Sequence, residues 1–278
     1  MAIICGDIHG HVEKVRAFLG HKPEEEHIAL GDYLDSFYEP QGRQLLALQL
    51  LLDSKAVLLW GNHDLHYLKM PPFICTGYQH KNEQVYRDLI ETNKYRFLAA
   101  YAVDGWLLTH AGCHIRLAKH KTDVVAIADR LNKKMAEYLE KPYEPGSEGI
   151  FAVGGGRGGG CRNGGIFWYD FKRETGLAPV KQIFGHTETR EGPVVTDTYV
   201  ALDTTNNKST CWFYDTAVNE LVTVLLPRRI ALISDLPEDE REPFNKFLLG
   251  QTIPAADGYY EEDYIRWKRL KMLGLVDE

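Results

Sequence analysis

Five clusters of polar side chains in this sequence are of a kind that could bind metal ions. Each directly follows a run of apolar residues, and they read Gly6-Asp7-Ile8-His9-Gly10, Gly31-Asp32-Tyr33-Leu34-Asp35, Gly61-Asn62-His63-Asp64, Thr109-His110-Ala111-Gly112 and Gly185-His186-Thr187-Glu188. Carboxylate oxygen, imidazole nitrogen and amide oxygen together suit Mn²⁺, Fe or Zn²⁺. One cluster alone is weak evidence, since a Gly-Asp pair is most often a turn. Five in series indicate a metal centre.

The apolar runs before these clusters predict the elements that position them. We expect short buried strands at 2–6, 27–31, 56–60, 106–109 and 180–184. Helical spacing of apolar residues predicts helices at 12–19, 43–52, from about 65, at 82–93 and at 122–139. Such alternation favours parallel pairing, and open α/β sheets bind ligands outside the carboxyl ends of their strands. The clusters should therefore converge.

The second half of the chain has a different character. A glycine-rich stretch at 154–165 predicts a flexible surface loop, and short β runs follow at 193–196, 199–203, 210–214 and 221–226. We expect these runs to form a second, partly antiparallel sheet stacked on the first, with a hairpin turn at 206–208. Residues 97–103 and 106–109 are expected to form a β pair.

Composition narrows the class of protein. The 278 residues include 32 Lys and Arg against 39 Asp and Glu, a net charge of −7, so we expect no extensive nucleic-acid surface. A first strand starting at Ala2 leaves no room for a secretory signal, and no apolar run approaches the ~20 residues that span a bilayer. The 5 cysteines, irregularly spaced, indicate reduced thiols. A cytoplasmic protein is expected, and Cys161 is the thiol to watch for reactivity.

The five clusters resemble the motifs of the calcineurin-like metallophosphoesterases: D-x-H, G-D-x-x-D, G-N-H-[DE], H-x-G or H-A-G, and G-H-T or G-H-x-H. They occur here in that order over residues 6–188. The resemblance implies an α/β, four-layer sandwich of two mixed β-sheets flanked by helices. We assign residues 1–234 to this metallophosphoesterase domain and 235–278 to a C-terminal helical appendage packed on it.

The resemblance also implies a binuclear centre with six ligands: Asp7, His9, Asp32, Asn62, His110 and His186. The first two would hold one ion, Asp32 would bridge, and the other three would hold the second ion. We expect two divalent ions, Mn²⁺ first, with Fe or Zn²⁺ as alternatives. A metal-bound hydroxide would attack the phosphorus atom.

His63 is not expected to be a ligand, because it directly follows Asn62 and the two side chains must face different ways. The resemblance gives His63 the role of protonating the leaving group, and Asp35 would orient it. This pair favours the phosphoprotein-phosphatase-like branch of the family. The alternative for Asp35 is a cap on the next segment. Five further histidines have no motif assignment and are expected at the surface or beside the ligands: His11, His66, His80, His114 and His120.

Two departures from the family pattern leave roles open. The phosphatase branch has an Arg after the second Asp, where this chain has Ser36-Phe37. Arg157 and Arg162 are candidate replacements for binding phosphate, unless both are solvated loop charges, and Arg43 is a weaker choice.

The other departure is Glu188, which stands where the wider family has a second His. It could be an extra metal ligand, or it could point away from the centre.

The leading hypothesis is a phosphatase that hydrolyses phosphomonoesters, on a phosphorylated protein or a small molecule. A second hypothesis is a dinucleoside polyphosphate hydrolase or phosphodiesterase with the same bimetal core. A third is a metal-free binding scaffold, which the complete ligand set argues against. The sequence leaves the oligomeric state open.

Overall fold

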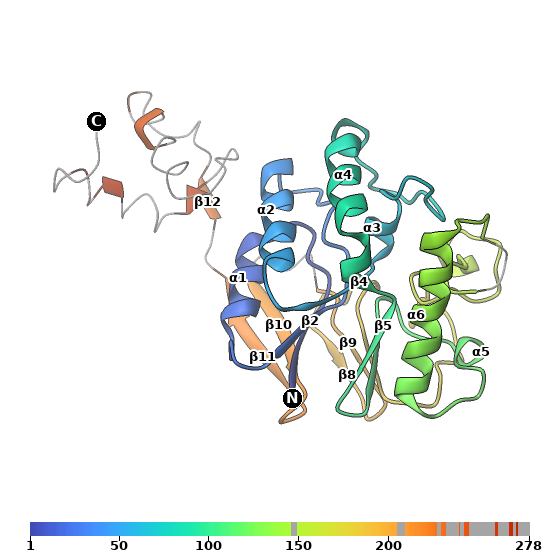
Figure 1. The fold of residues 1–278 in the computed structure, drawn as a ribbon. Helices are drawn as coiled ribbons and strands as arrows, with labels where there is room; N and C mark the ends of the chain where they lie inside the picture. The colour runs from blue at the N-terminus through green and yellow to red at the C-terminus, as the bar shows by residue number, and fades with distance from the viewer. Residues whose placement is uncertain are drawn as a thin grey trace.

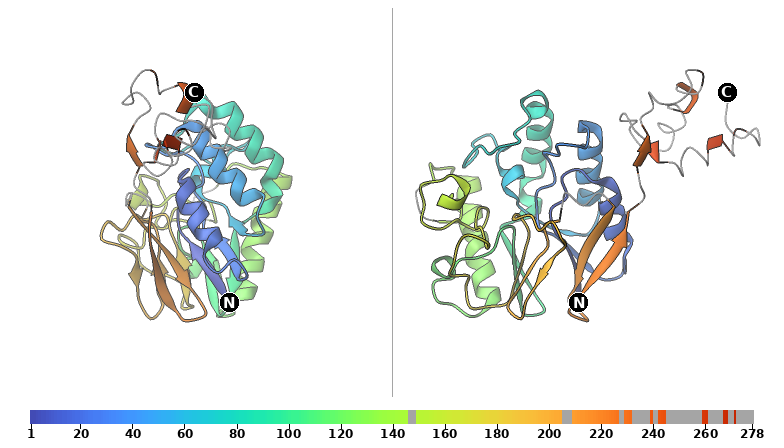
Figure 2. Two further views of the ribbon diagram at one scale, coloured as in Figure 1. Left: turned by 90° about the vertical axis from the view of Figure 1, so that its left-hand side faces the viewer. Right: turned by 180° about the vertical axis from the view of Figure 1, so that it is seen from behind.

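The computed structural model describes residues 1–145, 149–204 and 209–226, and beyond them only 229–231, 239, 242–244, 259–260, 267–268 and 271. Two β-sheets lie at the centre with helices on their outer faces (Figures 1 and 2). The predicted α/β sandwich of two mixed sheets flanked by helices is therefore confirmed. Within the described ranges, no helix is both long and apolar enough to cross a bilayer.

The first sheet has six strands in the order β11-β10-β1-β2-β3-β4. Their bounds are β1 (Ala2–Cys5), β2 (Glu26–Ala29), β3 (Val57–Leu59), β4 (Phe97–Leu98), β10 (Thr210–Asp215) and β11 (Glu220–Leu225). Strands β1 to β4 pair in parallel, and β10 joins β1 antiparallel. Parallel pairing brings the carboxyl ends of β1, β2 and β3 to one edge.

The second sheet has five strands in the order β5-β6-β7-β9-β8. They are β5 (Ala100–Val103), β6 (Trp106–Thr109), β7 (Gln182–Phe184), β8 (Val194–Val195) and β9 (Tyr199–Ala201). The central strands β6, β7 and β9 are parallel, with an antiparallel strand at either edge. A separate two-stranded ladder joins β12 (Arg229–Ala231) to β13 (Tyr259–Tyr260).

Helices cover the outer faces of both sheets (Figure 1). They are α1 (Val12–Gly20), α2 (Gln41–Leu52), α3 (Asn62–Leu65), α4 (Glu83–Asn93), α5 (Ile115–Ala118) and α6 (Val124–Glu140), with 3₁₀ turns η1 (His80–Asn82), η2 (Lys94–Arg96) and η3 (Gly155–Arg157). Helix α6 is tied to the second sheet by Asn132, whose side chain accepts from the amides of Ala99 and Ala100 and donates to the carbonyl of Ala100. Asp123 caps the amino end of α6.

The alternation of side chains along β1 explains the layered core. Successive residues of a strand point to opposite faces, so one set faces the helices and the other faces the second sheet. Ile3 and Cys5 belong to the core cluster that includes α1 and α2. Ala2 and Ile4 belong to the cluster shared with β6, β7 and β9. Hydrophobic burial on both faces fixes the register of β1 and hence the position of the loop after it.

Two expectations about elements are wrong, and a third is right only in part. The runs at 210–214 and 221–226 join the first sheet through β1, rather than the second sheet. The expected β pair is confirmed for Ala100–Val103, which pair antiparallel with Trp106–Thr109, but the run at 97–103 is split at Ala99, and Phe97–Leu98 form β4 of the first sheet. The helix expected from about Leu65 instead ends there. The turn at 206–208 and nearly all of the appendage at 235–278 lie outside the described residues, and both stay predictions.

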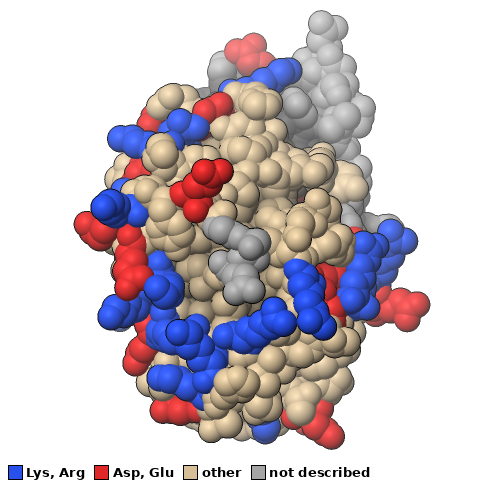
Figure 3. All heavy atoms as spheres, turned by 90° about the vertical axis from the view of Figure 1, so that its right-hand side faces the viewer, with Lys and Arg blue, Asp and Glu red and all other residues tan. Residues whose placement is uncertain are grey.

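One face of the molecule carries many Lys and Arg side chains, together with some Asp and Glu (Figure 3). Figure 3 shows Lys and Arg side chains gathered on the side where α5 and α6 lie in Figure 1. The overall negative charge of the chain does not predict this, because composition averages over all faces of the molecule.

Candidate metal centre and its surroundings

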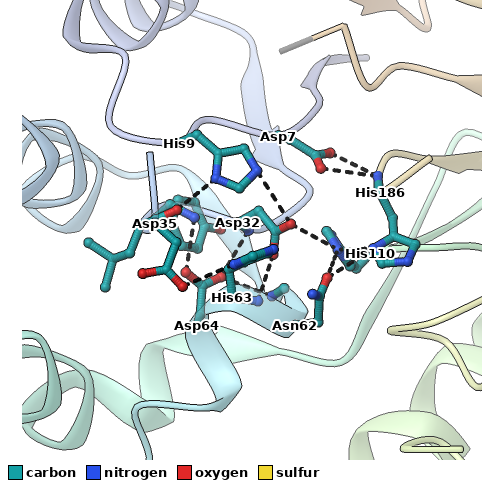
Figure 4. A network of polar contacts seen from close by, with 12 residues as sticks. Asp7, His9, Asp32, Asp35, Asn62, His63, Asp64, His110 and His186 are labelled. Atoms are coloured by element: carbon teal, nitrogen blue, oxygen red, sulfur yellow. Dashed lines mark hydrogen bonds and ion pairs between the residues drawn. The ribbon is translucent and has the colours of Figure 1, made fainter. Parts of the chain in front are cut away.

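The carboxyl ends of five strands deliver the polar clusters to one place (Figure 4). The loops after β1, β2 and β3 bring three of them from the first sheet, and the loops after β6 and β7 bring two from the second. Backbone contacts fasten the loops together: the amide of His9 donates to the carbonyl of Asp32 at 2.7 Å, and that of Gly185 to the carbonyl of His110 at 2.7 Å. The site therefore depends on both sheets.

The first ligand group consists of Asp7, His9 and Asp32, whose potential ligand atoms all lie within 4.8 Å of one another. His9 Nδ1 donates to the carbonyl of Leu34 at 2.7 Å, so Nε2 is left with a lone pair and lies 3.6 Å from Asp32 Oδ2. A backbone carbonyl that fixes one imidazole nitrogen in this way is typical of metal-binding histidines.

The second group consists of Asp32, His110 and His186, so Asp32 belongs to both groups. His110 repeats the arrangement of His9, because its Nδ1 lies 2.9 Å from the carbonyl of Leu30 and its Nε2 faces the site. The amide oxygen of Asn62 lies 2.9 Å from both His110 Nε2 and His186 Nδ1. The six predicted ligands thus surround one space, and a shared Asp32 is suited to bridging two ions.

Burial and charge give the two aspartates opposite pKa shifts. Burial, and then the charge of Asp203, raise the pKa of Asp7 well above its ordinary value. Burial also acts to raise the pKa of Asp32, but the imidazoles of His110 and His63 hold it well below the ordinary value. Asp203, just after β9, is a carboxylate near the site that no motif identified. The only sequence feature that could have indicated Asp203 is its place at the end of the β run at 199–203.

Glycine precedes two of the ligands because nothing larger fits there. A Cβ on Gly61 would lie 2.2 Å from Asp32 Oδ1, and one on Gly185 would lie 2.0 Å from Asp7 Oδ1. The absence of these side chains lets each carboxylate pack against the backbone of the neighbouring loop. The amide of His186 then donates to both oxygens of Asp7, at 3.0 and 3.1 Å.

Four residues of the site have left-handed backbone conformations: His9 (φ 43°), Asp32 (φ 53°), Asp35 (φ 62°) and His186 (φ 65°). Such angles are uncommon for residues other than glycine and cost on the order of 1–3 kcal/mol each. The hydrogen bonds between the loops hold the residues in this conformation, which aims their side chains inward.

The side chains present fit divalent cations. Two buried carboxylates, three imidazoles and an amide oxygen form a mixed oxygen and nitrogen donor set with no thiol among them. His186 Nε2 is buried and has no hydrogen-bond partner among the described residues. A cation would also neutralise the carboxylates, which otherwise lie together in a site of low dielectric constant.

Asp64 has a clear structural role that the motif did not reveal. It is fully buried, and its Oδ2 accepts from the amides of Asp32 and Gly61 at 2.9 and 3.0 Å, while Oδ1 accepts from that of Tyr33 at 2.9 Å. Burial, and then the charge of Asp32, raise its pKa to about 7. Asp64 therefore joins the loop after β3 to the loop after β2 and fixes the backbone of Asp32.

His63 and Asp35 lie beside the ligand groups (Figure 4). His63 Nδ1 is 3.0 Å from Asp35 Oδ2. Asp35 is further held by His66, whose Nε2 is 2.6 Å from Oδ2, and by the Tyr67 hydroxyl, which donates to Oδ1 at 2.5 Å. His66, which was expected at the surface or beside the ligands, is fully buried, and neither it nor Tyr67 was predicted to support this pair. The carboxylate of Asp35 is buried and contacts His63, His66 and Tyr67, so its role goes beyond a cap on the next segment.

The three candidate arginines have different environments. Arg157 donates to the Thr187 hydroxyl at 2.6 Å, next to His186, and its Nε lies 3.3 Å from Asp170. Arg162 is exposed, and its charge, after burial and the charge of Arg116, helps to lower the pKa of His114.

Arg43 is buried in ion pairs with Glu13 and Glu39. A guanidinium held between two carboxylates is poorly placed to bind phosphate. Of the three arginines, Arg157 is the one positioned at the metal centre.

Glu188 is half-buried, and its carboxylate belongs to neither ligand group. Its backbone carbonyl accepts from the Lys172 ammonium at 2.5 Å. The role of Glu188 as an extra ligand stays a prediction, as do the roles of the six main ligands.

The thiols also differ from one another. Cys5, Cys113 and Cys211 are buried, whereas Cys75 and Cys161 are partly accessible. Cys75, which the sequence did not single out, lies beside His66. Burial acts to raise the pKa of Cys75, but hydrogen bonds to His63 and His66 lower it below its ordinary value.

Comparison with known proteins identifies the class. The family model for the calcineurin-like phosphoesterases matches residues 2–190. No curated protein sequence matches the chain.

Among solved structures, the cold-active protein-tyrosine phosphatase of a psychrophilic Shewanella is similar, with a TM-score of 0.54 and 15% identity over 81% of this chain and 77% of that one. Its I115M mutant has a TM-score of 0.51, also at 15% identity, with the same coverage of the two chains. A serine/threonine phosphatase from Saccharomyces cerevisiae has a TM-score of 0.49 and 13% identity over 85% of this chain and 81% of that one. At these identities the likeness to the two Shewanella structures is one of fold.

The chain therefore belongs to the calcineurin-like phosphoesterases. It is a metallophosphoesterase, a metal-dependent enzyme that hydrolyses phosphoric esters.

Proposed function

We propose that the enzyme hydrolyses phosphomonoesters, with His63 as the general acid and Asp35 as the residue that orients it. The contact of 3.0 Å between His63 Nδ1 and Asp35 Oδ2 carries this proposal. Expulsion of an alkoxide needs a proton on the departing oxygen, and a diester or anhydride with a more acidic leaving group needs it less. A buried and well-supported histidine–carboxylate pair is thus most useful to an enzyme acting on poor leaving groups.

The surroundings of His63 favour its protonated form. Burial acts to lower its pKa, but the charge of Asp32 and the hydrogen bond to Asp35 raise it well above the ordinary value. With Nδ1 directed at Asp35, the second nitrogen, Nε2, has no protein hydrogen-bond partner among the described residues and can donate to substrate. The side chain is 16% exposed, so a leaving group can reach it.

We also propose Asp7, His9, Asp32, Asn62, His110 and His186 as ligands of two divalent ions, with Mn²⁺ favoured because oxygen and nitrogen donors fill the centre. When bound, such ions supply Lewis acidity and lower the pKa of water. Arg157 lies at the edge of the centre, where its guanidinium can contact a phosphate oxygen.

The test is the dependence of hydrolysis on the leaving group in Mn²⁺-loaded wild type and His63→Asn. With a phosphoserine peptide, the variant should be about 10²–10⁴-fold slower. With p-nitrophenyl phosphate, whose leaving group needs little protonation, the loss should be much smaller. His120→Asn, an exposed histidine, is the matched control and should behave as wild type. Metal content should be equal in all three proteins.

Equal slowing on both esters would remove His63 from the acid role. A wild type that ignores monoesters but cleaves bis(p-nitrophenyl) phosphate or diadenosine tetraphosphate would overturn the substrate class. Both outcomes are read from the same set of initial rates.

A further inference from the structure

Next to the metal centre, a second set of side chains has the composition of a soft-metal site. His63, His66 and Cys75 place two imidazole nitrogens and a thiol sulfur within 4.8 Å of one another. Cys75 Sγ lies 3.0 Å from His66 Nδ1 and 3.9 Å from His63 Nδ1. None of the six ligands proposed above supplies an atom to this set.

The distances suit a tetrahedral ion. Zinc binds sulfur at about 2.3 Å and imidazole nitrogen at about 2.0–2.1 Å, so a nitrogen–sulfur edge of its tetrahedron is roughly 3.6 Å long. The two observed separations, 3.0 and 3.9 Å, bracket this value. Side-chain movements of a few tenths of an ångström would bring both edges to the ideal length.

Asp35 orients the His66 ring so that Nδ1 can bind a metal ion. The fully buried His66 ring has its Nε2 at 2.6 Å from Asp35 Oδ2, which leaves Nδ1 directed at Cys75. A histidine held by a carboxylate on one nitrogen, with the other nitrogen free for a metal, is the common arrangement at zinc sites. Cys75 and His63 are only partly buried, so an ion can enter from solvent.

We propose that His63, His66 and Cys75 form a separate binding site for Zn²⁺, and that zinc bound there inhibits hydrolysis. One thiolate and two imidazoles favour Zn²⁺ over Mn²⁺, whereas the carboxylate-rich centre accepts Mn²⁺. His63 Nδ1 cannot both bind a metal ion and donate to Asp35. Zinc would therefore take His63 away from its orienting carboxylate. Inhibition, but not binding, rests on the proposed function of His63.

Binding is tested with Cd²⁺ added to Mn²⁺-loaded protein, because cadmium bound to a thiolate has an ultraviolet charge-transfer absorption. Wild type should develop this absorption with one equivalent of Cd²⁺. Cys75→Ser should not, and Cys75→Ala serves as a second variant should the first fail to fold. Cys161→Ser removes the other partly accessible thiol and should retain the absorption.

Inhibition is tested by titrating Zn²⁺ against hydrolysis of a phosphoserine peptide. Loss of a ligand should raise the inhibitory zinc concentration at least about tenfold in Cys75→Ser, and not in Cys161→Ser, since even outer-shell changes at zinc sites cost 10–100-fold. Cys75 Sγ also lies 3.6 Å from Asn62 Nδ2, so zinc inhibition is expressed relative to the Mn²⁺-dependent rate of each variant before zinc is added.

Cadmium absorption that survives in Cys75→Ser, or is absent from wild type, would overturn the site. Equal zinc inhibition of wild type and Cys75→Ser would show that zinc acts by displacing Mn²⁺, and would overturn the inhibitory role. A protein with the Cys75-dependent absorption but no hydrolysis of monoesters would instead contradict the proposed function and leave the zinc site standing.

Discussion

Replacing Asp64 with Asn tests whether this buried carboxylate holds the metal centre together. Its two oxygens accept from three amides, those of Asp32, Gly61 and Tyr33, at 2.9–3.0 Å. Asparagine has a single acceptor oxygen. Its best orientation puts that oxygen in the place of Oδ2 and keeps two bonds, which leaves the amide of Tyr33 facing an NH₂ group.

One buried donor without an acceptor costs about 1–3 kcal/mol. We therefore expect Asp64→Asn to lower the free energy of unfolding by this amount in urea denaturation at a pH above about 7, where Asp64 is ionised and both oxygens accept. Because Asp64 fixes the backbone of Asp32, Mn²⁺ affinity should also fall by about 10–100-fold, measured as the metal concentration for half-maximal activity.

Asp123→Asn is the matched control, since Asp123 accepts one amide at 3.0 Å as the cap of α6 and Asn is an equally good cap. It should change stability little. An Asp64→Asn protein within about 0.5 kcal/mol of wild type, with unchanged Mn²⁺ dependence, would refute the reasoning.

Two more changes probe other contacts. Tyr67→Phe removes the hydroxyl that donates to Asp35 at 2.5 Å. A hydrogen bond to a charged group is worth about 1.5 kcal/mol, so its loss should slow hydrolysis of a phosphoserine peptide about tenfold, with less effect on p-nitrophenyl phosphate. Rates equal to those of wild type would contradict this. Burial acts to raise the pKa of Asp215, but the Lys22 ammonium at 2.5 Å lowers this pKa below its ordinary value of 3.8. The ion pair therefore stabilises the fold above pH 3.8, and its contribution is lost as the pH falls through the lowered pKa. Lys22→Met should be less stable than wild type at neutral pH and equally stable in acid well below pH 3.8, as measured by urea denaturation; a difference that persists in acid would argue against the ion pair.

Much of the site could be predicted because each ligand lies in a short sequence segment that also contains the strand and the turn that position it. An apolar run followed by Gly-Asp or Gly-Asn marks a buried strand and the turn after it, and the tight packing at Gly61 explains why the glycine belongs to the pattern. Parallel pairing then brings the strand ends together. The two-sheet sandwich followed from the family resemblance of the same clusters.

The remaining features depend on partners distant in sequence. The hairpin of β10 and β11 looks the same whichever sheet it joins, and only its pairing with β1, more than 200 residues earlier, decides this. Ala99 gave no sign that the chain crosses between sheets there, because the apolar run continues through it. Cys75 and His66 meet through an irregular loop, where neither periodicity nor motif spacing predicts a contact.

The chain supplies the parts of the centre in a fixed order during synthesis. The His186 amide binds the Asp7 carboxylate across a separation of 179 residues. A nascent chain therefore exposes the aspartates of the first sheet well before the last imidazole emerges from the ribosome, and the centre cannot be complete until translation has passed that point. A chain truncated before β7 would have the acidic loops of the first sheet but would lack His186. Full metal content would therefore indicate that the two sheets have come together.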